Sequence, residues 1–188
     1  MGTKDKLGLF SVGKDDVKLM LRWGGRALFE PETKIKKTSS NPGLASSTLR
    51  KKLIGRLRKR GIVDDTVLNA MATVERHQFV DSALASMAYE DLALPIGFKQ
   101  TISQPFVVAR TISIVRELLS KNRSEDELAK LNILEVGCGS GYQAAVLSEC
   151  FGKVTSVERI YPLYEKALKN CEEYISKQKL KLHFYDGK

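Results

Sequence analysis

Apolar residues are distributed differently in the two halves of this chain, and the second half has the pattern of an α/β fold. Three short, continuous apolar runs are typical of strands in a parallel sheet, at residues 133–136, 154–157 and 180–185. Two segments between them, 142–151 and 161–177, carry apolar side chains at helical spacing. This alternation of strand and helix predicts a parallel sheet with helices packed on it.

The first half has a helical pattern. Leucines recur every fourth position from residue 49 to residue 57, which predicts a helix that begins near Ser47 and ends at Gly61. Asp64 or Asp65 is placed to cap a second helix. The apolar stripe of that helix consists of Val67, Leu68, Met71 and Val74.

A third helix is predicted to begin at Pro105, because proline is favoured in the first helical turn and an apolar stripe follows at residues 108–119. Thr101, Ser103 and Gln104 therefore cluster at a helix N-terminus, where backbone amides and the helix dipole favour an anion. Most of the preceding segment, residues 88–105, has no steady period, so neither a helix nor a strand is predicted there.

The domain organisation is predicted from composition. Residues 1–46 mix glycine, lysine, serine and proline, and we expect them to form a basic, poorly ordered arm, with residues 38–43 as a linker. One domain is expected at 47–188, with a helical cap at 47–120 and a cofactor-binding half-sheet at 131–188.

Glycines stand at alternate positions between the first strand and the helix that follows it. Gly137, Gly139 and Gly141 lack a Cβ, so a ligand can approach the backbone closely. Glu158 ends the next strand, where an acid can accept hydrogen bonds from ribose hydroxyls. The G-x-G-x-G spacing differs from the G-x-G-x-x-G that holds a pyrophosphate, and it suits S-adenosylmethionine, which carries no phosphate. An ordinary tight turn is the alternative interpretation.

The net charge of +9 is concentrated near the N-terminus, where residues 1–60 carry 16 Lys and Arg against 5 Asp and Glu. A basic patch can indicate nucleic-acid binding. However, aromatic side chains suited to base stacking are few there, namely Phe10, Trp23 and Phe29. A solvated charged surface, including a wet helix face at 50–59, is the favoured interpretation, and nucleic acid is an unlikely partner.

Other function classes receive little support from the sequence. Cys138, Cys150 and Cys171 are widely spaced, and His77 and His183 have no metal-ligand spacing around them, so neither a disulfide framework nor a metal site is predicted. Apolar runs are broken by charges within a few residues, and no membrane span is expected. We expect a cytoplasmic protein with a hydrophobic content of 43%, typical of globular chains.

Four motifs occur in order: AYED at 88–91, LPIG at 94–97, QTISQP at 100–105 and LEVGCGSGYQ at 134–143. With them the chain resembles the bacterial type of protein-L-isoaspartate O-methyltransferase. The resemblance implies a Rossmann-like fold of the S-adenosylmethionine-dependent methyltransferases. It further implies methyl transfer from S-adenosyl-L-methionine to the free carboxylate of L-isoaspartyl residues in damaged proteins, which begins their repair.

Residue roles follow from the same resemblance. Ser103 falls on the family's characteristic serine, and Thr101, Ser103 and Gln104 would orient the substrate carboxylate. The cofactor would be held by Gly137, Gly139, Gly141, Glu158, Asp186 and Gly187, with Asp186 beside the adenine. A carboxylate is already ionised at neutral pH, so the reaction needs no general base, and alignment of the two reactants with exclusion of water can supply much of the acceleration.

The expected domain is incomplete at its C-terminus. A doubly wound sheet usually continues beyond its third strand, with further strands on the other side of the first. We therefore expect the strand at 133–136 to be an open edge, and activity of these 188 residues alone to be doubtful. An inactive methyltransferase-like binding module is the main alternative function, and a nucleic-acid methyltransferase is a less favoured one.

Overall fold

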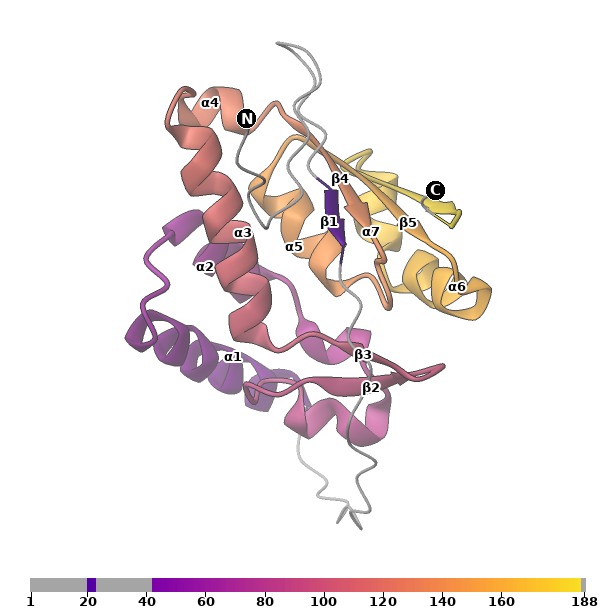
Figure 1. Ribbon diagram of the computed structural model, residues 1–188. Coiled ribbons are helices and arrows are strands. Elements are labelled where there is room, and N and C mark those ends of the chain that lie inside the picture. Colours follow the sequence, from indigo (N-terminus) through magenta and orange to yellow (C-terminus); the bar gives the residue numbers. More distant parts are fainter. Residues whose placement is uncertain (1–19, 23–41, 187–188) are drawn as a thin grey trace, which may run out of the picture.

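The structure is a computed structural model that describes residues 20–22 and 42–186 of the chain (Figure 1). Its main sheet has four parallel strands in the order β1-β4-β5-β6. These strands are β1 (Met20–Arg22), β4 (Asn132–Val136), β5 (Lys153–Glu158) and β6 (Leu180–Phe184). The predicted α/β class and the three predicted parallel strands are confirmed.

Strand β1 corrects the expectation of an open edge at β4. Met20, Leu21 and Arg22 pair in parallel with Leu134, Glu135 and Val136, so a segment of the N-terminal arm lies beside the strand that was expected to have no neighbour. This strand was not predicted, because three residues without alternation are too short for a periodic signal. The remainder of the predicted arm up to residue 41 lies outside the described residues.

Helices connect the parallel strands. Helix α5 (Tyr142–Cys150) links β4 to β5, while α6 (Tyr161–Asn170) and α7 (Glu172–Ser176) lie between β5 and β6. A single helix over 161–177 was predicted, but the structure breaks it at Cys171, whose backbone leaves the helical conformation with φ −104° and ψ 12°. Cys171 is fully buried, and its thiol donates a hydrogen bond to the Gly141 carbonyl. These contacts stabilise the break.

The sheet is buried mainly on one face. Ile133, Glu135, Val154, Ser156 and Glu158 are buried, while the alternating residues of β4 and β5 are only half-buried or exposed. Such a period of two is typical of a sheet that is covered on one side.

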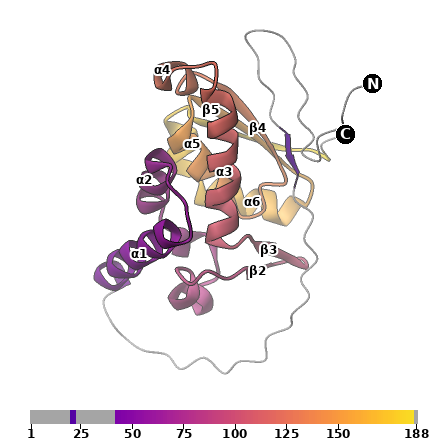
Figure 2. The same ribbon diagram turned by 60° about the vertical axis from the view of Figure 1, so that its left-hand side comes forward.

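The helical part consists of α1 (Pro42–Lys59), α2 (Asp65–Thr73), α3 (Pro105–Ser120) and the short α4 (Glu125–Leu128). Figures 1 and 2 show α1, α2 and α3 as neighbours, and Figure 1 shows α6 on the opposite side of the molecule from α1. Helix α1 begins at Pro42, five residues before the predicted start, as proline favours a first turn. It ends as predicted before Gly61, which has φ +90°.

Two predicted helix boundaries in this part are confirmed. Asp64 is the N-cap of α2, where its carboxylate accepts a hydrogen bond of 3.1 Å from the Val67 amide. Helix α3 has Gln104 as its N-cap and Pro105 at its first position. Helix α4, by contrast, was not predicted, although Ser124 and Glu127 form a complete capping box there.

Two 3₁₀ helices precede the segment without a period, and that segment contains a hairpin. The 3₁₀ helices are η1 (Arg76–Phe79) and η2 (Ser82–Met87), and the hairpin pairs β2 (Leu94–Gly97) with β3 (Gln100–Ile102). The prediction of neither helix nor strand was therefore wrong for this hairpin. Its strands are only four and three residues long with a register shift at residues 95–97, which leaves no measurable period.

Several arginines of α1 form ion pairs with acidic side chains, which the prediction of a solvated charged face did not include. Arg50 contacts Glu75 at 2.9 Å, Arg58 contacts Asp65 at 2.6 Å, and Arg56 contacts Glu90 at 3.2 Å. Lys51 and Lys52 are exposed, as the prediction of a solvated face requires. Much of the basic charge after residue 47 is thus matched by acids of α2, η1 and the loop before β2.

Candidate functional site

The three glycines form the turn that joins the carboxyl end of β4 to α5. Each has a positive φ, of 89° at Gly137, 58° at Gly139 and 94° at Gly141, and Gly141 is the N-cap of α5. At Gly141 a side chain is also excluded by space, since an added Cβ would lie 2.5 Å from the Cys171 sulfur. The turn therefore needs glycine for its backbone conformation and for its packing on α6.

Contacts from β5 and α6 hold this glycine turn in place. The Gly137 amide donates to the Val157 carbonyl at 2.8 Å, and the Asn170 side-chain amide donates to the Ser140 carbonyl at 2.9 Å. The Gly139 amide donates to the Glu158 carboxylate at 2.9 Å. A rigid cradle for a ligand is the structural result.

Glu158 is placed at the end of β5 as predicted, and it is almost fully buried. Its carboxylate accepts hydrogen bonds from three backbone amides, those of Gly139, Arg159 and Ile160, at 2.8–2.9 Å. Oε1 accepts two of these bonds and Oε2 only one. A carboxylate oxygen offers about two acceptor positions, so Oε2 retains one for a hydroxyl group.

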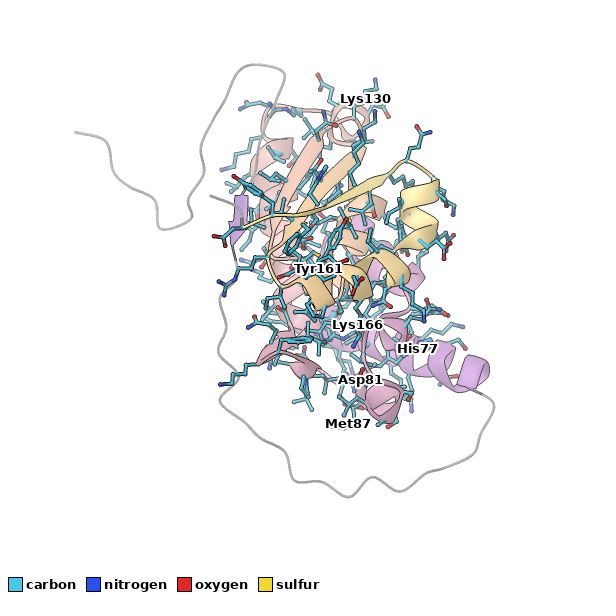
Figure 3. All side chains as sticks on the ribbon, turned by 90° about the vertical axis from the view of Figure 1, so that its right-hand side faces the viewer. His77, Asp81, Met87, Lys130, Tyr161 and Lys166 are labelled. Atoms are coloured by element: carbon cyan, nitrogen blue, oxygen red, sulfur yellow. The ribbon has the colours of Figure 1, made fainter. Side chains whose placement is uncertain are left out.

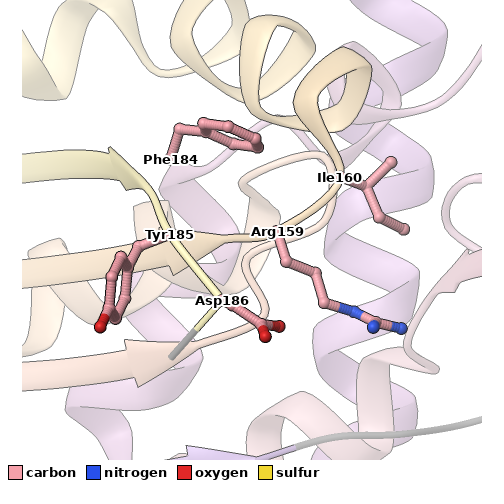
Figure 4. A pocket seen from close by; sticks show the side chains of 5 residues that line it. All are labelled: Arg159, Ile160, Phe184, Tyr185 and Asp186. Carbon is pink, nitrogen blue, oxygen red and sulfur yellow. The ribbon is translucent and has the colours of Figure 1, made fainter. Parts of the chain in front are cut away.

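A pocket of about 560 Å³ opens beside Glu158, at the carboxyl ends of β5 and β6. Its lining consists of Arg159, Ile160, Phe184, Tyr185 and Asp186 (Figure 4). Phe184 packs edge-on against Tyr161 of α6, with ring centroids 5.2 Å apart, which fixes one apolar wall. The pocket thus combines apolar surface with a carboxylate, a suitable environment for a purine ring.

Predicted site residues fall in two groups within the described part of the chain. Gly137, Gly139, Gly141 and Glu158 meet at the glycine turn, and Asp186 lies close by in the pocket. Gly187 lies outside the described residues. Thr101, Ser103 and Gln104 form the second group and are half-buried. Thr101 lies in β3, and Ser103 and Gln104 connect that strand to α3.

The hairpin brings this second group towards the glycine turn. Ile96 of β2 packs on Gly139, so that a Cβ added there would lie 3.0 Å from the Ile96 side chain. The Ser103 carbonyl accepts a 2.8 Å hydrogen bond from Arg76, whose guanidinium lies over the ring of Tyr142, the residue after Gly141. The two predicted groups therefore belong to one connected region.

Three residues of this region were not predicted. Asp91 accepts a 2.8 Å hydrogen bond from the Phe106 amide and caps α3 from a distance, since the N-cap Gln104 makes no side-chain capping bond. Arg76 is fully buried, and so is Glu135 of β4. A sequence signal existed for Glu135, namely an acid inside an apolar strand, but Asp91 and Arg76 act through tertiary contacts that no local pattern shows.

Glu135 is the most perturbed acid of the region. Burial raises the pKa of its carboxyl to about 7, and the nearby Glu158 carboxylate also raises it, while a hydrogen bond from the Ser156 hydroxyl at 2.6 Å acts in the opposite direction. Burial likewise raises the pKa of the Cys138 thiol. That thiol is therefore unreactive at neutral pH.

His77 has a structural contact with a tyrosine. His77 Nδ1 lies 2.8 Å from the Tyr89 hydroxyl, within the helical part seen in Figure 3. Across residues 20–22 and 42–186 we find no group of three or more His, Cys, Asp or Glu side chains arranged for a metal ion. Nor does any helix in those ranges combine the length and apolar character that crossing a membrane requires.

Comparison with known proteins identifies the family. The sequence profile described as protein-L-isoaspartate(D-aspartate) O-methyltransferase (PCMT) matches residues 47–188, about three-quarters of the chain. This chain belongs to the PCMT family. The protein-L-isoaspartate O-methyltransferases of Bordetella avium and Bordetella parapertussis are 51% and 57% identical to it, over 80% and 69% of its length.

Solved structures agree with the PCMT fold. A protein-L-isoaspartate O-methyltransferase structure with 31% identity superimposes with a TM-score of 0.61, over 73% of this chain and 42% of its own. A PCMT structure from Plasmodium falciparum, in complex with S-adenosyl-L-homocysteine, also gives a TM-score of 0.61 at 24% identity, over 72% of this chain and 62% of its own. The methyltransferase Rossmann-like fold is therefore confirmed.

The chain spans about half the length of the curated relatives that it matches, 53% of the Bordetella avium protein and 46% of the Bordetella parapertussis protein. The matched part contains both groups of predicted site residues.

Proposed function

We propose that this chain binds S-adenosyl-L-methionine and transfers its methyl group to the free carboxylate of L-isoaspartyl residues in damaged proteins. The observation that carries the proposal is the glycine turn held by Glu158 beside the pocket of Asp186, in a chain of the PCMT family. The donor set suits this cofactor. Carboxylates, backbone amides and apolar walls can bind an adenosine, and no phosphate-binding cation is needed.

The cofactor-binding roles proposed for single residues follow the geometry. Gly137, Gly139 and Gly141 form the turn at the carboxyl end of β4 beside which the cofactor would lie, and the remaining acceptor position of Glu158 would receive a ribose hydroxyl. Asp186 and Gly187 would contact the adenine. The support for this role is that Asp186 lines the pocket. When bound, the sulfonium supplies an electrophilic methyl group.

The substrate-binding role is proposed for Thr101, Ser103 and Gln104. Their support is the position before the N-terminus of the 16-residue helix α3, which favours an anion. An isoaspartyl carboxylate is ionised at neutral pH, so these residues need only hold it in line with the methyl group and exclude water. Ser103 is the residue proposed to contact the reacting carboxylate.

The proposal includes the division into a helical cap at 47–120 and a cofactor-binding half-sheet at 131–188, which assigns substrate to the first and cofactor to the second. It also includes a cytoplasmic location. The support is that all three cysteines are free thiols, as in a reducing compartment. Isoaspartyl-containing proteins would be the partners.

The test measures binding and turnover separately. Calorimetry with S-adenosyl-L-homocysteine should show binding, and Glu158→Ala should weaken it by about 1.5–3 kcal/mol, the range for a charge-assisted hydrogen bond. Glu173→Ala is the matched control, because Glu173 is exposed and pairs with Lys177. Equal affinities of the two variants would remove Glu158 from the cofactor site.

Turnover is tested with two isomeric peptides that differ only in an isoaspartyl or an aspartyl linkage. Radiolabelled methyl groups should appear on the isoaspartyl peptide alone. Binding of the cofactor product without any methylation would identify the chain as a methyltransferase-like binding module. Absence of both binding and turnover would overturn the proposed function.

A further inference from the structure

Arg76 makes unusual contacts for a buried arginine. Its side chain is completely buried and donates to three backbone carbonyls, those of Ala88 at 2.8 Å, Leu92 at 3.3 Å and Ser103 at 2.8 Å. Its Cζ lies 4.8 Å from the ring centroid of Tyr142. One side chain thus contacts the end of the hairpin segment and the first residue after the glycine turn.

The charge of Arg76 has no paired carboxylate. Among residues 20–22 and 42–186, the ion pairs include Arg50, Arg56, Arg58, Arg60 and Arg116, but not Arg76. Asp91 is the acid that acts on it through space, and the Asp91 carboxylate is already engaged by the Phe106 amide and by Arg60. Nη1 of Arg76 is buried and makes no hydrogen bond of ordinary geometry with the described residues, and the neutral Tyr142 hydroxyl is the neighbouring group that acts on this side chain.

Arg116, which is also buried, has the carboxylate partners that usually compensate the charge of a buried arginine. It contacts Asp64 at 2.9 Å and Glu125 at 2.6 Å and also donates to Thr66 and to the Cys150 carbonyl. Burial of a cation without such partners is strongly unfavourable. A guanidinium stays protonated in proteins, so Arg76 is a fixed positive charge with incomplete compensation.

We propose that Arg76 is a positioning residue that joins the substrate segment to the glycine turn, and that its fixed charge attracts the substrate carboxylate. The first part follows from the hydrogen bond to Ser103 and the contact with Tyr142. The second follows from electrostatics, because a desolvated cation acts on a nearby anion through a low effective dielectric constant. The electrostatic part of this inference rests on the proposed function, because that function supplies the substrate carboxylate. The geometric part does not depend on it.

The geometric part predicts that Arg76 couples two segments that are far apart in sequence. Replacing it with lysine keeps the charge but removes the fork that reaches several carbonyls at once. Hydrogen exchange by mass spectrometry should then become faster in residues 100–104 and also in residues 137–142. The matched control is Arg116→Lys, which should affect the contacts around α2 and α4 and leave the exchange of both site segments unchanged.

The electrostatic part is tested with ligands of different charge. In the presence of S-adenosyl-L-homocysteine, Arg76→Met should weaken binding of an isoaspartyl peptide by about tenfold or more, and Arg76→Lys should recover most of that loss. The same peptide as its uncharged methyl ester should bind the unaltered chain and Arg76→Met equally. Affinity for S-adenosyl-L-homocysteine is measured for each variant as well, so that a loss caused by a looser glycine turn is separated from the loss of peptide affinity.

Kinetics give a further separation, since a rise in KM for the peptide with little change in kcat indicates lost ground-state attraction. An Arg76→Lys variant with unchanged exchange in one of the two site segments would refute the coupling. Equal loss of affinity for the acid and the ester would refute the electrostatic role. Failure of the unaltered chain to bind peptide would refute the proposed function and the electrostatic part, while the exchange comparison would still decide the coupling.

Discussion

Glu135 is an acid in the interior of a parallel sheet, where charge is unfavourable. It is one residue before Val136 and the glycine turn, and it accepts a hydrogen bond from Ser156 of the neighbouring strand. Burial raises its pKa from an ordinary 4.5 to about 7, so that near neutral pH it exchanges between a neutral and a charged form. Its protonation state therefore affects the stability of the sheet next to the candidate cofactor site.

This shift predicts the direction of a pH effect on stability. The folded protein holds the proton more tightly than the unfolded chain, so the stabilising contribution is fully present below about pH 4.5 and is lost as the pH rises through 7. Its size is on the order of 3 kcal/mol for the full shift. Urea unfolding between pH 4.5 and 8 should show this slope, and Glu135→Gln should remove it. An exposed acid of α3 serves as control in Glu117→Gln, and the same slope in both variants would contradict the assignment to Glu135.

At the scale of elements, the glycine turn is the part whose geometry is most strictly determined. Gly141 combines a φ of +94° with close contacts to α6, whereas Gly61 has a similar φ of +90° and open space around it. The two positions therefore separate the energetic effect of backbone conformation from that of packing.

Alanine at both positions should reveal the difference. Gly61→Ala is expected to lower the free energy of unfolding by about 1–2 kcal/mol, the penalty for a left-handed L-residue. Gly141→Ala should lower it by a further 1–3 kcal/mol or so, because the new methyl group overlaps the Cys171 sulfur. Chemical denaturation measures both losses, and equal losses would show that α6 yields without energetic penalty.

The same element shows how much could be predicted from sequence. The strand, the glycine turn, α5 and the acid at the end of β5 are encoded within a few neighbouring residues, so periodicity and glycine spacing indicated them. The β2–β3 hairpin is local, but its strands are too short to show a period. The capping of α3 by Asp91 and the contacts of Arg76 depend on residues 12 to 27 positions apart. Local patterns carry no information on such partners, and only the family motifs singled out the hairpin segment as a predicted substrate site.

At the scale of the whole molecule, the helical part and the sheet share one hydrophobic core. Leu57 of α1 and Leu147 of α5 are both fully buried members of the same cluster. Polar contacts also cross between the parts, as where Lys166 of α6 meets Asp81 before η2 at 2.9 Å (Figure 3). The helical part and the sheet therefore support each other, so the proposed substrate segment is held in a fixed position relative to the glycine turn.

A shared core predicts a single cooperative unfolding transition for residues 47–186. Leu57→Ala and Leu147→Ala should each lower the free energy of unfolding by about 2–5 kcal/mol. Far-ultraviolet and near-ultraviolet circular dichroism should give the same urea midpoint in each variant, because both parts lose structure together. Leu118→Ala, at a residue of α3 that is 40% exposed, is the control and should cost clearly less. If Leu57→Ala instead produced an early transition of the helices while the sheet retained its original midpoint, the two parts would be independent units, and the coupling between substrate segment and glycine turn would have to come from the hairpin alone.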